Sequence, residues 1–228
     1  MSNSNYTVSA LKYRPNSWET IIGQENIATT LKQAIDSSQL AQAYLFCGPR
    51  GVGKTSTARL FAKSINLKHD PNLTDFTYNI YELDAASNNQ VDDIRNLNDQ
   101  VRIPPQRGNY KVYVIDEVHM LSQSAFNAFL KTLEEPPPHA IFILATTEKP
   151  KIIPTILSRC QVYDFHRISI PDMVAHLENI ASKEGVKSEP EALHVIAEKS
   201  EGALRNTISC FDLKEHFTNS NIPYKEVR

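Results

Sequence analysis

The chain alternates between short runs of consecutive apolar residues and longer stretches in which apolar residues recur every three or four positions. The apolar runs lie at 43–47, 111–118 and 140–147, and more mixed runs lie at 78–84 and 161–165. Near-continuous apolar runs of this length are typical of parallel strands buried on both faces, whereas the recurring spacing is typical of amphipathic helices. The alternation predicts an α/β fold with a doubly wound, five-stranded parallel sheet covered by helices on both faces.

Helices are expected in the segments between these strands. The first covers about 24–38, where the apolar residues share one face, and another runs over about 54–66. The next two helices follow Ser87 and Ser122, whose hydroxyl groups can cap a helix N-terminus, and the second of them ends before Pro136. This order of elements predicts crossover connections between parallel strands.

The pattern changes after His166. Three helical stretches without strands between them follow, at 171–184, 189–199 and 203–217. A glycine follows the first of them and another precedes the third, as expected where helices end or begin. This predicts two domains, an α/β domain over 1–166 and a small three-helix domain over 167–228.

The most specific motif lies between the first strand and the helix after it. Residues 48–55, GPRGVGKT, fit the pattern G-x-x-x-x-G-K-[ST]. Glycines let backbone N–H groups close around a phosphate, Lys54 would neutralise the β- and γ-phosphates, and the Thr55 hydroxyl would hold Mg²⁺. A chance match is the alternative, but the strand before the loop and the helix after it disfavour that reading. The residues expected to bind the nucleoside triphosphate are Gly48, Gly51, Val52, Gly53, Lys54, Thr55 and Ser56.

Two acids and two threonines end neighbouring apolar runs. Asp116 and Glu117 end one run, and Thr146 and Thr147 end the next. An acid at the first position can support Mg²⁺, and the second acid, which points the other way, can polarise a water for attack on the γ-phosphate. A threonine hydroxyl could contact that phosphate or the water. The alternatives are solvated acids and threonines that serve only strand pairing.

Three further groups give no functional signal from their spacing alone. Arg159 and Arg205 are isolated arginines near predicted element ends, and such residues are more often surface charges than catalytic groups. The cluster Tyr13, Arg14 and Pro15 reads as a surface segment of the N-terminal arm.

Composition narrows the class of protein. The chain has 228 residues, 41% of them hydrophobic, and a formal net charge of −2. It is therefore no general electrostatic trap for nucleic acid, and its apolar runs are too short to span a membrane. The N-terminus lacks the basic and apolar regions of a signal peptide, so a cytoplasmic location is expected. The three cysteines are far apart, which suggests neither a disulfide framework nor a zinc site.

Nine short segments, spread over nearly the whole chain, form a set. They are YRP (13–15), IIGQE (21–25), GPRGVGKTSTAR (48–59), ELDAASNN (82–89), VYVIDEVHMLS (112–122), AFNAFLKTLEEPP (125–137), ATTEKP (145–150), LSRC (157–160) and EGALR (201–205). Together they resemble the AAA+ ATPases, and within them the gamma/tau family of bacterial clamp-loader motors of DNA polymerase III. The SRC, ELDAASNN and KTLEEPP segments resemble this family rather than phosphate-loop proteins in general.

The resemblance implies roles for the groups that spacing left open. Tyr13, Arg14 and Pro15 would form a clamp on the adenine side of ATP. Thr147, with Thr146 beside it, matches the residue called sensor 1.

Both arginines also acquire roles from the resemblance. Arg159 is similar to the arginine finger that reaches the ATP of a neighbouring subunit. Arg205 is similar to sensor 2, which contacts the γ-phosphate of its own subunit from the lid.

The same resemblance implies an activity and partners. The expected protein is an ATPase motor that uses ATP and Mg²⁺ to load a ring-shaped sliding clamp on primer–template DNA. Its expected partners are the delta and delta-prime loader subunits, the clamp and the DNA, with no membrane.

Two departures from the family pattern stand out. The family usually carries a four-cysteine zinc module before the ELDAASNN segment, whereas residues 67–77 contain no cysteine, so no zinc site is expected. The family also continues into a helical collar that joins the subunits, and this chain ends at Arg228. A monomer or weak oligomer is therefore expected for the chain alone.

Two other functions compete with the clamp-loader motor. One is a non-hydrolysing scaffold subunit of the same loader, which the complete set Lys54, Thr55, Asp116 and Glu117 disfavours. The other is a related DNA-remodelling motor such as a Holliday-junction branch-migration ATPase, which the SRC and ELDAASNN segments disfavour.

Overall fold

The structure is a computed structural model that describes residues 9–217 and 221–224. The chain forms two compact units. The first, here called the sheet unit, comprises residues 25–48 and 54–165. The second, here called the lid unit, comprises the described residues of 1–24, 49–53 and 166–228.

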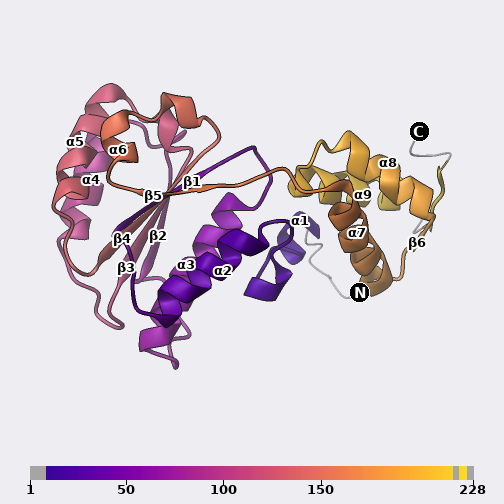
Figure 1. The fold of residues 1–228 in the computed structure, drawn as a ribbon, viewed down its shortest axis with the longest axis horizontal. Coiled ribbons are helices and arrows are strands. Elements are labelled where there is room, and N and C mark those ends of the chain that lie inside the picture. The colour runs from indigo at the N-terminus through magenta and orange to yellow at the C-terminus, as the bar shows by residue number, and fades with distance from the viewer. Residues whose placement is uncertain (1–8, 218–220, 225–228) are drawn as a thin grey trace, which may run out of the picture. The chain divides into compact units, whose positions relative to one another are not determined.

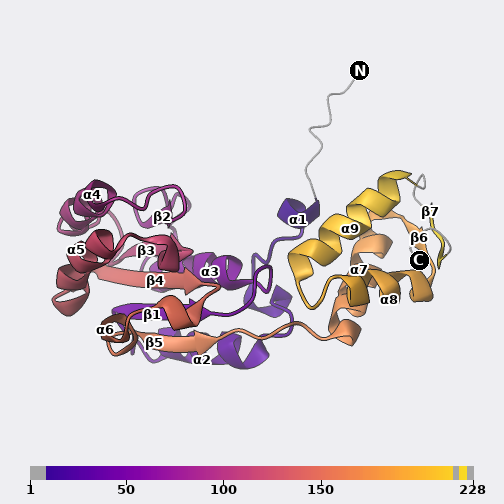
Figure 2. The same cartoon turned by 90° about the horizontal axis from the view of Figure 1, so that it is seen from above.

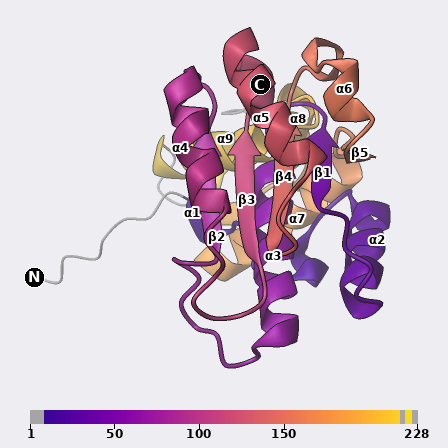
Figure 3. The same ribbon diagram turned by 90° about the vertical axis from the view of Figure 1, so that its left-hand side faces the viewer.

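Five parallel strands form the centre of the sheet unit. They are β1 (Ala43–Cys47), β2 (Ile80–Asp84), β3 (Lys111–Asp116), β4 (Ala140–Thr146) and β5 (Gln161–Asp164). Their order across the sheet is β2-β3-β4-β1-β5, as Figure 3 shows. All residues of β1 and β4 are buried, which explains their unbroken apolar runs. The predicted doubly wound parallel sheet is confirmed.

Helices cover both faces of this sheet (Figure 1). Helices α2 (Glu25–Asp36) and α3 (Lys54–His69) lie on one face, and α4 (Val91–Val101) and α5 (Gln123–Glu134) lie on the other. The short helix α6 (Pro154–Leu157) packs against α5, and two 3₁₀ turns, η2 (Val118–Met120) and η3 (Lys149–Lys151), follow β3 and β4.

Side chains from alternate strand positions fill the space between the sheet and the helices on each of its faces. Toward α4 and α5 the sheet presents Leu45, Ile115 and Leu144, all fully buried. The rings of Phe129 and Phe142 meet edge to face there, with centroids 5.3 Å apart. The core therefore fixes the sheet, and with it the carboxyl ends of β1, β3 and β4, where the loops begin.

One of the two predicted helix caps is correct. The Ser122 hydroxyl accepts a hydrogen bond from the backbone N–H of Ala125, 3.2 Å away, at the start of α5. The Ser87 cap is wrong, because the Ser87 hydroxyl donates to the Asp84 carboxylate and α4 begins only at Val91. There the Asp93 carboxylate accepts from the N–H of Gln90 at 3.1 Å instead.

The end of α3 also differs from its prediction. The helix continues to His69 rather than ending at Asn66. Its last turn carries Lys68 and His69, and basic side chains are favourable beside the negative end of a helix. The Asn66 amide also donates to the Ala62 carbonyl oxygen within the helix, so this asparagine does not interrupt it.

The lid unit contains the three predicted helices, α7 (Ile170–Glu184), α8 (Pro190–Lys199) and α9 (Leu204–Phe217). It also contains the short helix α1 (Ser9–Lys12), which lies beside α9, and the 3₁₀ turn η1 (Trp18–Thr20) (Figure 2). The Ser9 N–H donates to Asp212 Oδ2 of α9 at 2.9 Å. Gly185 ends α7 with φ 70°, a left-handed conformation that suits glycine.

The prediction that the lid contains no strands is wrong. Lys187–Ser188 (β6) and Asn221–Ile222 (β7) form a parallel pair. Strands of two residues are too short to produce an apolar pattern, so the sequence gives no sign of them.

The compact units differ from the predicted domains 1–166 and 167–228. The described residues before 25 pack with the lid helices, and Ala10 and Tyr13 contribute to the lid core. The domain bounds 1–166 and 167–228 therefore remain a prediction. Within the described residues, no helix is long and apolar enough to cross a membrane.

Candidate nucleotide site

The phosphate loop starts where β1 ends. The N–H of Gly48 donates to the Thr146 carbonyl oxygen at 3.2 Å, which ties the start of the loop to the end of β4. Gly48 has φ 146°, and a Cβ at this position would collide with the Phe165 carbonyl oxygen. Gly53 has φ 103°, also a left-handed conformation. Two of the glycines in the motif are thus required by the backbone.

The first two residues of α3 carry the side chains that the motif predicts. Lys54 is 6% exposed, and its ammonium group donates to the Gly48 carbonyl oxygen at 2.7 Å. The Thr55 hydroxyl donates to Asp116 Oδ2, also at 2.7 Å. Both contacts lie at the N-terminal end of a 16-residue helix, where its dipole favours anions.

Asp116 and Glu117 diverge directly after β3. Asp116 faces Thr55, whereas the Glu117 backbone turns into the left-handed region with φ 48° and ψ 45°. That conformation costs on the order of 1–3 kcal/mol for a residue with a Cβ and is often found at functional sites. The Glu117 N–H donates to Asp116 Oδ1 at 3.0 Å, which keeps the two acids in a defined relation.

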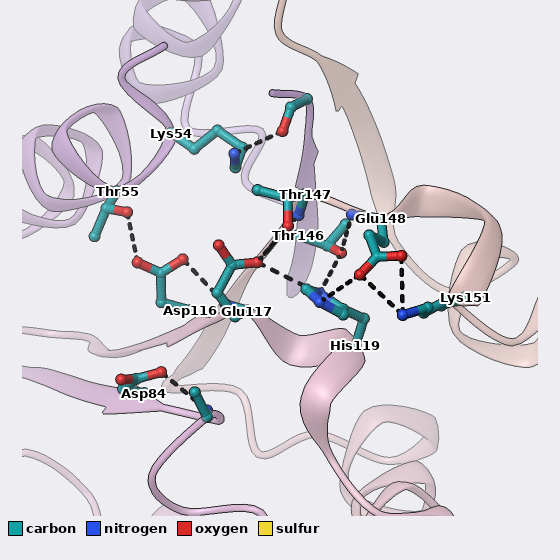
Figure 4. A network of polar contacts seen from close by, with 12 residues as sticks. Lys54, Thr55, Asp84, Asp116, Glu117, His119, Thr146, Thr147, Glu148 and Lys151 are labelled. Carbon is teal, nitrogen blue, oxygen red and sulfur yellow. Dashed lines mark hydrogen bonds and ion pairs between the residues drawn. The ribbon is translucent and has the colours of Figure 1, made fainter. Parts of the chain in front are cut away.

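The two threonines at the end of β4 contact different partners (Figure 4). Thr147 donates to Glu117 Oε2 through both its N–H, at 3.2 Å, and its hydroxyl, at 2.9 Å. Thr146 is fully buried, and its hydroxyl oxygen accepts from the Glu148 N–H and lies 3.0 Å from His119 Nδ1. The structure thus brings Thr55, Asp116, Glu117 and Thr147 together, and this set is here called the acid–threonine cluster.

The donor set of the cluster suits Mg²⁺. Thr55 and Asp116 offer a hydroxyl and a carboxylate oxygen close together, and hard oxygen ligands are those that Mg²⁺ prefers. Lys54 supplies a cation at the start of α3, directly after the glycine-containing loop. The residues present therefore fit a magnesium–triphosphate group.

Arg159 lies outside this cluster. It follows α6, and its guanidinium donates to the Thr155 carbonyl oxygen at 2.7 Å and to Glu134 Oε1 at 2.8 Å. The side chains of Arg159 and Glu134 are 33% and 48% exposed. The structure thus gives Arg159 partners from α5 and α6 and no contact with Glu117 or Thr147.

Arg205 lies in the lid unit together with the middle of the phosphate loop. Its N–H donates to the Gly51 carbonyl oxygen at 3.3 Å. A Cβ on Gly51 would lie 3.2 Å from the Cβ of Ala203 and 3.4 Å from that of Arg205, so glycine allows this close approach. The lid unit thus holds loop residues 49–53 against the start of α9.

Tyr13 and Arg14 line a cavity of about 700 Å³ within the lid unit, and Pro15 is not among its lining residues. The Tyr13 hydroxyl donates to the Glu184 carboxylate at the end of α7. His176, on the α7 wall of the cavity, has a buried Nε2 without a hydrogen-bond partner among the described residues. Burial lowers the pKa of His176, with a smaller contribution from Lys183.

Sequence reasoning missed the polar side chains that surround the acids. His119 contacts Thr146, Glu117 and Glu148, and the Lys151 ammonium donates to Glu148 at 2.9 Å. The only sequence signal was a histidine two residues after the acid pair, in the order D-E-x-H. Glu134, the partner of Arg159, gave no separate signal.

The cysteines are free thiols. Burial raises the pKa of Cys47 to about 11 and that of Cys160 to about 12, so these two are protonated near neutral pH. Among the described residues, no three His, Cys, Asp or Glu side chains are grouped so that they could hold a metal ion by themselves.

Two family models match the chain. The one described as DNA polymerase III, delta subunit, matches residues 23–169, and the one described as DNA polymerase III clamp loader subunit, ATPase lid domain, matches residues 172–212. The second match covers most of the three lid helices.

Among curated proteins, DNA polymerase III subunit tau of Bacillus subtilis is 47% identical over 213 residues, 88% of this chain and 38% of that protein. The tau subunit of Escherichia coli is 43% identical over 91% of this chain and 34% of its own length. The gamma subunit of a Buchnera aphidicola strain is 41% identical over 98% of this chain and 64% of its own length. The chain thus spans between about a third and two thirds of these relatives.

A solved structure of the RuvB Holliday junction branch migration motor of Thermotoga maritima has the same fold. The TM-score is 0.73, and the match covers 94% of this chain and 70% of that chain at 21% identity. The likeness at this identity concerns the fold alone, a parallel sheet with covering helices and a helical lid after it in the chain.

Proposed function

The chain belongs to the family of DNA polymerase III clamp-loader subunits, and on that premise we propose that it is an ATP-hydrolysing motor subunit of a clamp loader. It would use ATP and Mg²⁺ to place a sliding clamp on primer–template DNA, together with the delta and delta-prime loader subunits. We propose that this clamp loading takes place in the cytoplasm.

The acid–threonine cluster is the observation that carries the proposal. A subunit that only binds nucleotide needs the loop, Lys54 and Thr55. Hydrolysis also needs a base that orients water, and Glu117 is held for such a role by two hydrogen bonds from Thr147. Within the described residues both of these bonds reach Oε2, and no hydrogen bond reaches Oε1. That oxygen would orient the attacking water.

The remaining residues would bind and orient the nucleotide. The Lys54 ammonium group would exchange its bond to the Gly48 carbonyl for the β- and γ-phosphates. Thr55 and Asp116 would hold Mg²⁺, which supplies neutralisation of phosphate charge when bound. Gly48, Gly51, Val52, Gly53 and Ser56 would surround the phosphates, and Tyr13, Arg14 and Pro15 would contact the adenine side.

Both arginines would act on the γ-phosphate. Arg205 would reach it from the lid unit, in which its N–H donates to the Gly51 carbonyl oxygen of the phosphate loop. Arg159 would serve the neighbouring subunit's ATP as an arginine finger. Its absence of contact with the acids of its own chain is consistent with that role.

Two alternatives compete with this proposal. A non-hydrolysing scaffold subunit would not need Glu117 held in a left-handed backbone conformation beside Thr147. A branch-migration motor shares the fold, but the 21% identity to RuvB contrasts with 41–47% to the tau and gamma subunits. The conformation of Glu117 and the sequence identities both favour the clamp-loader motor.

The test is ATP turnover by the chain, assembled with its loader partners, in the presence of the clamp and primer–template DNA. We expect turnover that rises with both additions and is lost in Glu117→Gln. A complete absence of turnover would favour the scaffold. Stimulation by a four-way DNA junction and not by the clamp would favour a branch-migration motor.

A further inference from the structure

His119 is a buried polar side chain next to the acid pair, and the proposed function assigns it no role. It lies in η2, directly after β3, and its side chain is only 5% exposed. A buried imidazole requires partners for both nitrogens, since an unsatisfied polar atom costs about 1–3 kcal/mol. Its partners therefore indicate what the ring does.

Both nitrogens face functional groups at the end of the sheet (Figure 4). Nδ1 lies 3.0 Å from Thr146 Oγ1 and 3.4 Å from Glu117 Oε2. Nε2 lies 3.3 Å from Glu148 Oε1, and Glu148 is also bound by the Lys151 ammonium. The ring thus joins the proposed general base to the first residues after β4.

The contacts with Glu117 converge on one oxygen. Thr147 donates twice to Oε2, and His119 Nδ1 approaches the same atom. The Glu117 backbone is itself held, because its N–H donates to Asp116 Oδ1 at 3.0 Å and its carbonyl oxygen accepts from the Met120 N–H at 2.8 Å. The direction of the carboxylate depends on its own contacts, and among the described residues His119 is the contact that does not come from Thr147.

We propose that His119 is a positioning residue for ATP hydrolysis, which holds Glu117 Oε2 and the end of β4 in one arrangement so that Oε1 stays directed at the attacking water. The inference rests on the proposed function, because it requires Glu117 to be the general base. It goes beyond that function because it adds His119, and its contacts with Thr146 and Glu148, to the residues that hydrolysis requires.

A pair of substitutions separates the two sides of the ring. In His119→Asn the amide nitrogen can stand where Nδ1 stands, so the contacts with Thr146 and Glu117 can persist. In His119→Gln the amide reaches the position of Nε2, which faces Glu148. Positioning of Glu117 predicts rescue by Asn and not by Gln, whereas mere filling of buried space predicts similar behaviour of the two.

The experiment measures ATP affinity by titration calorimetry on the 228-residue chain, and ATP turnover by the chain assembled with its loader partners, the clamp and primer–template DNA. His119→Ala is expected to slow hydrolysis roughly 10- to 100-fold, because small misplacements of a catalytic group have effects of this size. Its ATP affinity should stay within about twofold of wild type, since no step of nucleotide binding uses the ring. His119→Asn should recover most of the rate, and His119→Gln should not.

Two further variants complete the set. His194→Ala removes an exposed histidine of α8 and should leave the rate unchanged. Combining His119→Ala with Glu117→Gln should slow hydrolysis no more than Glu117→Gln alone, because residues that act as a unit are not additive.

Several outcomes would overturn the inference. If wild type shows turnover that depends on Glu117 and His119→Ala is equally fast, the inference fails and the proposed function stands. Equal recovery by Asn and Gln would also reject it, in favour of a packing role. If His119→Ala unfolds in a thermal melt, the Asn and Gln pair decides. Wild type without turnover dependent on Glu117 would overturn both the inference and the proposed function.

Discussion

Two polar groupings in the sheet unit are held in different ways. The bonds of the acid–threonine cluster join residues 61 and 30 positions apart, from the loop helix, β3 and the end of β4. Arg159 instead bonds to a carbonyl four positions earlier and to one exposed carboxylate, that of Glu134. The cluster depends on the whole sheet, whereas the arginine depends on one short helix and one surface partner.

This difference suits the separate roles proposed for Glu117 and Arg159. A general base must be held within a fraction of an ångström, and a packed sheet supplies that rigidity. A finger offered to another subunit must instead be able to leave its resting partner, and exposed ion pairs are weak, typically 0.2–1 kcal/mol. If Glu117 is the proposed base and Arg159 the proposed finger, the packed sheet fixes the base, whereas the contacts of the arginine can be exchanged.

The largest expected effect is on the finger. In an assembly with loader partners, Arg159→Ala should lower turnover on the order of 10³–10⁵-fold and leave ATP affinity nearly intact, as for fingers supplied in trans. In the isolated chain, which should hydrolyse ATP very slowly, the same substitution should change the residual rate little. Steady-state turnover in both settings checks this.

Mixing variants sharpens that test. An assembly that contains both Arg159→Ala subunits and Lys54→Ala subunits should recover part of the activity. Some of its interfaces would join the intact loop of one subunit to the intact finger of another. A fast isolated chain that Arg159→Ala slows would show that the arginine acts within its own chain, and the shared site would then be wrong.

The next effect concerns the base. Glu117→Gln should lower turnover roughly 10²–10⁴-fold while ATP binds normally, because the amide cannot accept a proton from water. Calorimetric affinity and single-turnover rates measured on the same sample separate the two properties. Parallel loss of binding and rate would mean that Glu117 serves mainly the metal or the structure.

The sequence allowed much of this cluster to be predicted, because its members stand at the ends of buried strands. Parallel strands bring their carboxyl ends to one edge, so Thr55, Asp116, Glu117 and Thr147 could be expected to meet there. The left-handed backbone of Glu117 could not be predicted, since nothing in its residue type indicates a positive φ. The partners of His119 were also hidden, because Thr146 lies 27 positions away.

The errors in the fold have local causes. Ser87 looks like a cap, yet Asp84 already organises the turn by accepting from the N–H of Ala86 and from the Ser87 hydroxyl. The pair β6 and β7 is too short for any periodic signal. The association of the N-terminal arm with the lid helices depends on contacts between residues far apart in the sequence, such as Ser9 with Asp212 and Tyr13 with Glu184, which no local pattern encodes.

A smaller effect is expected for the loop lysine. Lys54→Ala removes a cation beside the phosphates, and hydrogen bonds to charged groups contribute about 1.5–3 kcal/mol, so ATP should bind roughly 10- to 100-fold more weakly. Titration calorimetry with MgATP measures this. Because Lys54 is almost fully buried, a thermal melt should accompany the titration. Unchanged affinity in a folded variant would reject the assignment of the loop.

The smallest effect concerns the resting partner of the finger. Glu134→Gln breaks an exposed pair, so the free energy of unfolding should fall by less than about 1 kcal/mol, equivalent to at most roughly 2–4 °C in a thermal melt. In the assembled loader it should raise turnover by up to about fivefold, because the guanidinium no longer has to leave a carboxylate before it reaches the neighbour's phosphate. Glu135→Gln, the adjacent exposed glutamate, is the matched control and should change neither value. Lower turnover in Glu134→Gln would show the opposite role, in which Glu134 holds Arg159 in its working position, and the pair would then belong with the acid–threonine cluster as part of the fixed machinery.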